Sequence, residues 1–152
     1  MMTKSIKWAV KEPNKPLEER KFEIQYENED ERSAKELKLA QTLVGGYVEM
    51  VWIGGKVQAL VDEEGMYKPL EHNCGFVGTI VFVHDEEGEE GNFWGSLTED
   101  ELRKLDAWVA VHNGLQHPGN VGPKIFSGAA ADEYRRLLAE DRKSQQRQWE
   151  SF

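Results

Sequence analysis

The stretch that decides the fold is Leu43-Val44-Gly45-Gly46-Tyr47-Val48-Glu49, where a helical pattern stops at two glycines and a strand pattern begins at once. Upstream, the capping-box pair Ser33 and Glu36 and a set of apolar residues predict a helix from about Ser33 to Leu43. Glycine after the last apolar turn is typical of a helix end, because it adopts the left-handed conformation at little cost. Alternating residues after the glycines predict a strand over Tyr47–Ile53.

Alternation of apolar and polar side chains also predicts strands at 6–10 and 21–26. Further strands are expected at 56–61, at the strongly β-prone run 76–83 and, as a short edge strand, at 92–95. The pair Gly54-Gly55 favours a hairpin between the strands 47–53 and 56–61. Short strands joined by turns favour antiparallel pairing. The sequence therefore predicts an α+β fold, with a mainly antiparallel sheet of four to five strands and two or three helices packed on one face.

The C-terminal third carries two more predicted helices. Thr98 and Glu101 form a second capping box, and the apolar residues that follow predict a helix to about His112. Residues 113–128 are rich in glycine and proline and predict a long loop before a final helix at 130–149. From Lys143 onward this helix has almost no apolar stripe until Trp149, so we expect its end to fray or to dock on a partner.

Length and composition favour a single folded domain over 1–152. Hydrophobic residues make up 39% of the 152 residues and charged residues 31%, which is typical of a globular protein. No apolar run approaches the roughly 20 residues of a membrane span, and the first residues do not resemble a secretory signal. The single cysteine, Cys74, excludes an internal disulfide framework. We therefore expect a cytoplasmic protein.

Acidic residues are concentrated in one segment of a chain whose net charge is −9. Eight acids and no Lys or Arg lie between Asp85 and Glu101. We interpret this segment as a solvated acidic loop followed by a helix start. Such a surface repels nucleic acid and attracts basic protein surfaces. If it is a protein-docking face, its residues are Asp85, Glu86, Glu87, Glu89 and Glu90.

The central region resembles a known family. The resemblance spans about Leu37–Leu102 and consists of the helix before Gly45-Gly46, the strand Tyr47-Val48-Glu49, the turn Asp62-Glu63-Glu64-Gly65, Asn73, the pair Gly78-Thr79 and the helix start Leu97-Thr98-Glu99-Asp100. In this order the motifs are similar to small proteins of phages and mobile elements, catalogued as a domain of unknown function with serial number 3846. The resemblance implies a family-like core at about 33–102 and a protein made inside an infected bacterial host. The segments on either side of that core look like additions.

Catalytic and metal-binding motifs are weak. Cys74 lies near His72 and His84 in the sequence, but the spacing matches no signature of a thiolate nucleophile or a metal site. The glycine pair after the first helix lies at a helix C-terminus, the wrong end for a phosphate. Glu49 or His72 would be the base of a nucleotide-acting enzyme, but no partner stands at a catalytic spacing. We expect no catalytic residues, no metal and no cofactor.

The resemblance to proteins of phages and mobile elements leads to a functional hypothesis. We expect a non-catalytic phage accessory protein that antagonises antiviral defence by sequestering a small nucleotide signal in a pocket of a homo-oligomer. The residues expected to bind the ligand are Tyr47, Glu49, Asn73, Thr79, Trp94 and Lys124. The alternative is an acidic inhibitor, similar to a DNA mimic, that docks on a host defence protein. Neither hypothesis includes direct nucleic-acid or membrane binding.

Overall fold

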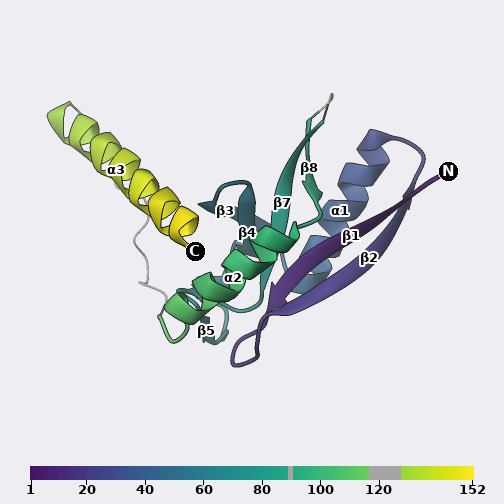
Figure 1. Ribbon diagram of the computed structural model, residues 1–152, viewed down its shortest axis with the longest axis horizontal. Helices are drawn as coiled ribbons and strands as arrows, with labels where there is room; N and C mark the ends of the chain where they lie inside the picture. The colour runs from purple at the N-terminus through teal and green to yellow at the C-terminus, as the bar shows by residue number, and fades with distance from the viewer. Residues whose placement is uncertain (89–90, 117–127) are drawn as a thin grey trace.

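The computed structural model describes residues 1–88, 91–116 and 128–152 and confirms an α+β fold (Figure 1). Its strands are β1 (Met2–Lys11), β2 (Glu18–Tyr26), β3 (Val48–Gly54), β4 (Val57–Asp62), β5 (His72–Asn73), β6 (Phe76–Val77), β7 (Ile80–Gly88) and β8 (Gly91–Gly95). Its helices are α1 (Glu29–Val44), α2 (Glu99–His112), α3 (Ala129–Ser151) and the 3-10 turn Gly65–Tyr67.

The main sheet has six strands, and every strand pair is antiparallel. Its order is β2-β1-β7-β4-β3, and β8 pairs with the far end of β7. The central strand β7 thus lies between β1, which comes from the start of the chain, and β4. Strands β5 and β6 form a separate two-stranded hairpin beside the sheet. The predicted antiparallel sheet is confirmed, with six strands where the sequence indicated four to five.

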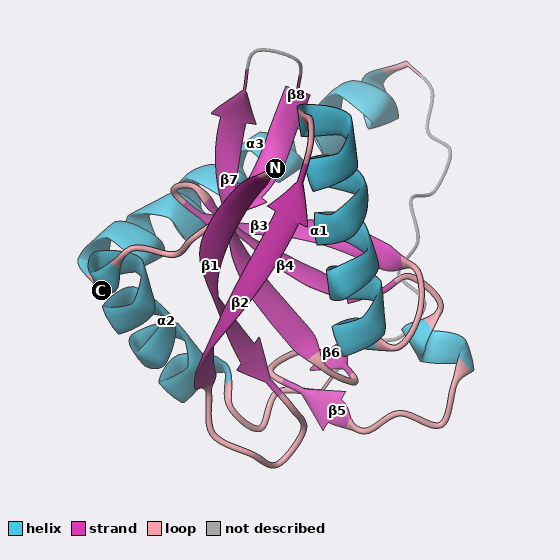
Figure 2. Cartoon of the chain, turned by 90° about the vertical axis from the view of Figure 1, so that its right-hand side faces the viewer, coloured by secondary structure: helices cyan, strands magenta, loops and turns pink. Residues whose placement is uncertain are grey.

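Helices cover both faces of the sheet, and not one face as predicted (Figure 2). Along β7, Val81 and Val83 pack with α1, while Ile80 and Phe82 pack with α2. Successive side chains of a strand point to opposite faces, so a strand that is apolar at every position must be covered on both. The uninterrupted apolar run at 80–83 was the sequence signal for this arrangement.

Helix α1 begins earlier than predicted. Asn28, not Ser33, is the N-cap, and its side-chain oxygen accepts a hydrogen bond from the backbone N–H of Glu31. The buried positions are four residues apart, at Arg32, Glu36, Ala40 and Val44. Polar residues therefore occupy half of the buried stripe, which is why an apolar pattern alone placed the helix start too late.

The acids at 85–87 lie on a strand and not on a solvated loop. The predicted strand 76–83 is interrupted at Gly78, which has a φ of 76°, and a new strand runs from Ile80 through the acids to Gly88. It pairs with β8, which confirms the predicted short strand at 92–95. The acidic side chains of this strand are therefore held in an extended arrangement rather than on a solvated loop.

The two C-terminal helices differ in how they are held. Helix α2 starts with the predicted capping box of Thr98 and Glu101 and packs along the sheet through Leu105 and Trp108. Helix α3 projects from the body and packs on β3 near its C-terminal end (Figure 1). None of the described helices is long and apolar enough to cross a membrane.

A candidate ligand cleft beneath the last helix

Trp149 anchors the end of α3 to the sheet. Its side chain is 4% exposed and belongs to the hydrophobic core on the α2 side. The indole lies directly on Gly54, where an added Cβ would come within 2.3 Å of Trp149 Cγ. Phe152 meets the indole edge-on with ring centroids 6.4 Å apart. The expected fraying of this end is therefore wrong, because Trp149 fills a site that only glycine leaves open.

Two glutamines extend the anchor along the edge strand β3. Gln145 donates from Nε2 to the carbonyl oxygens of Trp52 and Ile53, at 2.8 and 3.0 Å. Gln146 accepts a hydrogen bond from the backbone N–H of Gly55 at 2.9 Å. These contacts satisfy backbone groups that an edge strand otherwise leaves unpaired. Helix α3 thus takes the place of a further strand at this edge.

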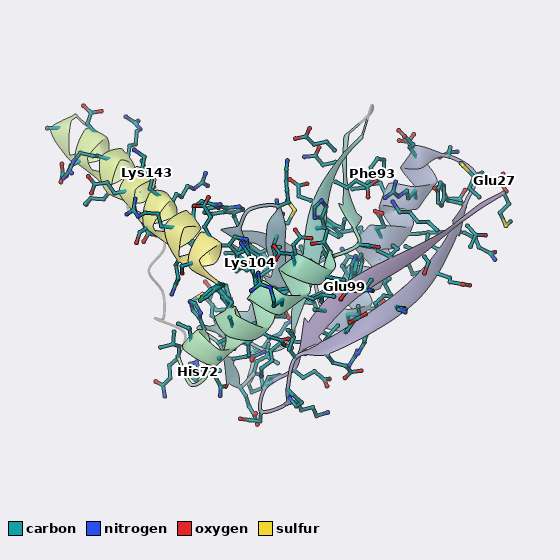
Figure 3. All side chains as sticks on the ribbon, viewed as in Figure 1. Glu27, His72, Phe93, Glu99, Lys104 and Lys143 are labelled. Carbon is teal, nitrogen blue, oxygen red and sulfur yellow. The ribbon has the colours of Figure 1, made fainter. Side chains whose placement is uncertain are left out.

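Beyond the anchor, the projecting part of α3 is held by its own side chains. Arg136 forms ion pairs with Glu133 and with Glu140, the latter at 2.8 Å, and Arg135 pairs with Asp132 at 3.2 Å. Exposed pairs at this spacing give a solvated helix only modest support. Lys143 lies on this part of the helix (Figure 3).

A cleft with a volume of about 580 Å³ lies between α3 and the body. Strand β3, the β5–β6 hairpin and α2 form one wall, which contains Ile53, Cys74, Phe76, Trp108 and His112. Helix α3 forms the opposite wall, with Asp141, Ser144, Gln145 and Gln148. The lining thus combines aromatic rings, amides and a single carboxylate.

The aromatic part of the cleft is rigidly built. The His112 ring stacks on the Trp108 indole with centroids 4.0 Å apart and planes 15° apart. Phe82 supports the same indole edge-on at 5.5 Å. His112 Nδ1 lies 2.8 Å from the carbonyl oxygen of Trp108, which fixes the imidazole one turn further along α2. Such prepositioned rings reduce the entropy that a ligand loses on binding.

The β5–β6 turn brings backbone strain to the floor of the cleft. Cys74 and Gly75 are its two central residues, and both have positive φ, 50° and 87°. A left-handed residue other than glycine is uncommon and clusters at functional sites. The Gly75 N–H donates to the carbonyl oxygen of Leu115 at 3.0 Å and ties the turn to the segment after α2. Burial raises the pKa of the Cys74 thiol, an effect that the nearby charge of Lys11 only partly offsets.

A smaller polar cavity of about 170 Å³ shares Cys74 and Leu115 with the cleft. It lies where the end of β1 meets the β5–β6 hairpin and the end of α2, near His72 in Figure 3. Lys11 and Asn73 form its inner wall, and Lys11 Nζ donates to Asn73 Oδ1 at 3.2 Å. The Asn73 amide in turn donates to the carbonyl oxygens of Lys11 and Gly78, at 2.7 and 2.8 Å.

The residues predicted to bind a ligand do not converge on one site. Tyr47 lines a 300 Å³ hollow beside the end of α1, and Glu49 lines a 160 Å³ hollow under the 3-10 turn. Trp94 lines a third one, of about 260 Å³, between α1 and the β7–β8 hairpin. Asn73 lies in the cavity beside the cleft, but the hydrogen bonds of its amide hold the hairpin against β1.

Thr79 and Lys124 complete the predicted ligand set. Thr79 is half-buried in the link between β6 and β7, outside the walls of the cleft and of the polar cavity. Lys124 lies outside the described residues. The residues that do line the cleft were missed, because they come from four separate parts of the chain. Two features of the sequence could have indicated the cleft. One is Trp149, an isolated aromatic residue, and the other is the predicted loop at 113–128, the first residues of which contribute to the cleft wall.

Of the acids proposed for protein docking that the structure describes, Glu86 and Glu87 lie close to Lys or Arg side chains of the protein itself. Glu86 accepts from Lys4 at 3.0 Å and lies 3.3 Å from Arg32 Nη2. Glu87 lies 3.5 Å from Lys56. Asp85 lines the hollow beside Trp94. Glu89 and Glu90 lie outside the described residues. Pairing with Lys and Arg reduces the negative field that a DNA mimic needs.

Glu86 provides a test of this pairing. Burial raises its pKa, but the hydrogen bond from Lys4 and the charges of Arg32 and Lys4 together hold the pKa below its ordinary value of 4.5. A carboxyl group with a lowered folded-state pKa stabilises the fold above its unfolded-state pKa and loses this contribution as the pH falls through the folded-state value. We therefore expect the acid loss of stability, measured by urea unfolding at a series of pH values, to be shallower in Glu86→Gln.

Replacement of the exposed Glu49 by glutamine serves as the control, because it removes one charge from another strand of the same sheet, β3. An unchanged acid limb in Glu86→Gln would contradict the ion pairs described here.

Within the described residues, no group of three or more His, Cys, Asp or Glu side chains is arranged to hold a metal ion. A histidine–carboxylate contact joins His84 Nδ1 to Glu101 at 2.9 Å and connects β7 with the start of α2. This pair lies away from the cleft walls, so its role is to attach the helix to the sheet.

The fold and the cleft together define a small α+β protein whose sheet is covered by helices on both faces and whose last helix leaves a ligand-sized hollow. The chain belongs to the family described as Domain of unknown function (DUF3846), whose model matches residues 6–110. The match is longer than the resemblance at 37–102 and includes β1 and β2, whereas α3 lies beyond it. No curated protein and no solved structure matches the chain.

Proposed function

We propose that this protein binds a small nucleotide in the cleft beneath α3 and sequesters it without changing it chemically. In this proposal it acts as an accessory protein of phages that removes a nucleotide signal used in bacterial antiviral defence. The family resemblance suggests that context, and the cleft is the observation that carries the binding. Its volume of about 580 Å³ lies within the roughly 300–1,000 Å³ of small-molecule sites.

The lining of the cleft suits a heteroaromatic ring. Phe76 and His112 are half-buried aromatic residues of the cleft wall, and stacking on such rings contributes about 1–3 kcal/mol per base in nucleic-acid-binding proteins. Gln148 from α3 brings an amide that both donates and accepts hydrogen bonds, as the edge of a base requires. In the described part of the chain the cleft wall holds Asp141 and no Lys or Arg, so it suits the base better than the phosphates.

The reactive groups near the cleft support binding rather than catalysis. The raised pKa of Cys74 keeps its thiol protonated at neutral pH, whereas a nucleophilic cysteine needs a lowered pKa. Glu49, a candidate base, is exposed and lines a different hollow. His72, the other candidate base, lines the polar cavity beside the cleft. A retained ligand is therefore the expected outcome.

Thermal melting against a panel of linear and cyclic nucleotides tests the proposal, when each mixture is afterwards analysed by mass spectrometry. We expect an upward shift of the melting temperature with at least one nucleotide, which is then recovered intact. A shift accompanied by loss of the nucleotide would identify an enzyme. No shift with any nucleotide would contradict the proposal and favour a protein partner for the acidic strand.

A bulky residue in the cleft provides a more specific test. Ser144 lines the cleft from α3, so Ser144→Phe is expected to fill part of the volume and to weaken binding of the best nucleotide by about tenfold or more. The matched control is Lys143→Phe, which places the same ring on an exposed neighbouring position outside the cleft wall (Figure 3).

Isothermal titration calorimetry of both variants measures the difference. Equal affinities in the two variants would show that the nucleotide binds elsewhere on the protein.

A further inference from the structure

We propose that the polar cavity beside the cleft is an anion site, in which Lys11 binds a phosphoryl group. Only one part of this inference rests on the proposed function, namely that the phosphoryl group belongs to a nucleotide whose base lies in the cleft. The anion site itself is argued from the burial of Lys11 and from the groups around it.

Lys11 is the most unusual charged residue of the cavity wall. The residue is 4% exposed, and its ammonium group donates to the carbonyl oxygen of Glu12 at 2.9 Å and to Asn73 Oδ1 at 3.2 Å. Both acceptors are neutral, and a lysine ammonium has three protons to donate. Within residues 1–88, 91–116 and 128–152, no carboxylate forms an ion pair with Lys11. A buried cation normally has a paired anion, because burial of an uncompensated charge is costly.

The nearest acids do not supply that anion. The Glu12 carboxylate turns to Lys15 at 3.2 Å and to Arg20 at 3.8 Å. Glu71 accepts a hydrogen bond from Asn14, whose side chain lines the outer part of the cavity. Both acids are engaged by other donors on the surface. The ammonium group of Lys11 can therefore form an ion pair with an anion that enters the cavity.

The remaining walls are rich in donors. Asn14, His72, Asn113 and Gln116 line the cavity together with Lys11 and Asn73, and its volume of about 170 Å³ suits one small polar group. A phosphoryl group accepts hydrogen bonds from lysine, amide and imidazole donors alike, and its bonds to charged donors are the strongest. The chemistry of the cavity therefore matches a phosphate better than an apolar or cationic group.

The position of the cavity relates it to the cleft. Cys74 and Leu115 belong to the walls of both, and the hydrogen bond from Gly75 N–H to Leu115 oxygen, 3.0 Å long, holds this shared wall together. A nucleotide whose base lies against Trp108 and His112 can therefore place its phosphate near Lys11. The two cavities supply complementary halves of one ligand: stacking surfaces in the cleft and a cation beside it.

Calorimetry with a nucleoside, its monophosphate and inorganic phosphate tests the inference, in wild-type protein, Lys11→Gln and the control Lys15→Gln. We expect the wild type to bind the monophosphate about tenfold or more tightly than the nucleoside, and to bind inorganic phosphate. Lys11→Gln should lose both the phosphate-dependent gain and the binding of inorganic phosphate. Lys15→Gln removes an exposed lysine of the same region and should behave as the wild type.

Since Lys11 also holds Asn73, a second measurement avoids dependence on a variant that folds poorly. In phosphorus NMR, wild-type protein should broaden the signal of inorganic phosphate. An excess of nucleotide should displace the phosphate and sharpen its signal again. Phosphate binding without any nucleoside or nucleotide binding in the cleft would support the anion site and overturn the proposed function. Nucleotide binding that Ser144→Phe abolishes and Lys11→Gln leaves unchanged, or wild-type protein without phosphate binding, would overturn the anion site.

Discussion

Replacement of Trp149 by alanine is expected to release α3 from the sheet and to lower the free energy of unfolding by about 3–5 kcal/mol. The indole is 4% exposed and joins the core formed by Val57, Leu105 and Trp108. Its removal leaves a large cavity, and the polar remainder of α3 has little else to hold it to the body. Urea unfolding measures the loss, with the exposed neighbour Arg147→Ala as the control on the same helix.

A second substitution on the opposite wall makes this prediction sharper. In Gly54→Ala the new Cβ would lie 2.3 Å from Trp149 Cγ, so the indole must move or the strand must shift. We expect a loss of about 1–3 kcal/mol in the wild-type background and much less when Trp149 is already alanine. Additive effects in the double variant would contradict the contact between Gly54 and Trp149. Loss of nucleotide binding in either single variant would show that the contact between Trp149 and Gly54 holds α3 in the position that forms the cleft.

Arg32→Met is the second substitution with a large expected effect, a loss of about 3–5 kcal/mol. The Arg32 guanidinium lies 3.0 Å from Glu36 and 4.2 Å above the centre of the Phe93 ring. Glu36 is 1% exposed and also accepts from the backbone N–H of Trp94 at 3.3 Å, so it joins α1 to β8. Removal of the arginine leaves this carboxylate buried without its cation.

The loss should depend on pH in a definite direction. Burial raises the pKa of Glu36, and the charge and hydrogen bond of Arg32 oppose that effect. A carboxyl group whose folded-state pKa is raised costs stability as the pH rises through the interval above its unfolded value of 4.5. Without Arg32 the pKa rises further, so Arg32→Met should lose more stability near neutral pH than near pH 4.

The double variant Arg32→Met/Glu36→Leu tests the same pair from the other side. It replaces both charges by apolar side chains and should regain most of the stability lost in Arg32→Met. Urea unfolding of the three proteins at about pH 4 and at neutral pH gives the required values. A loss in Arg32→Met that is equal at both pH values, or no recovery in the double variant, would contradict a buried ion pair.

Much of the fold could be predicted from the sequence, because its turns and caps are local signals. The glycine pair after Val44, the hairpin at Gly54-Gly55 and the capping box at Thr98 each act within a few residues. The start of α1 was missed because Arg32 and Glu36 occupy its buried face, and such burial depends on Phe93 and Trp94, far along the chain. The helices on both faces could have been inferred from the apolar run at 80–83.

The candidate site was less predictable, since its walls come from distant segments. Tyr47 and Glu49 are two residues apart in one predicted strand, but they line separate hollows. Lys11 gave no local signal, because its burial arises from Asn73 on another hairpin. Trp149 drew attention as an aromatic residue in a polar helix, but only the three-dimensional contact with Gly54 shows that it faces inward.

Equilibrium dialysis tests the central claim, that the cleft beneath α3 retains a small nucleotide unchanged. Protein is placed on one side of the membrane with the nucleotide that gives the largest melting shift, and both chambers are analysed by mass spectrometry. We expect the intact nucleotide to accumulate on the protein side, with much less accumulation for Ser144→Phe and full accumulation for Lys143→Phe. Equal concentrations in both chambers with the wild-type protein, or a chemically altered nucleotide, would contradict the account.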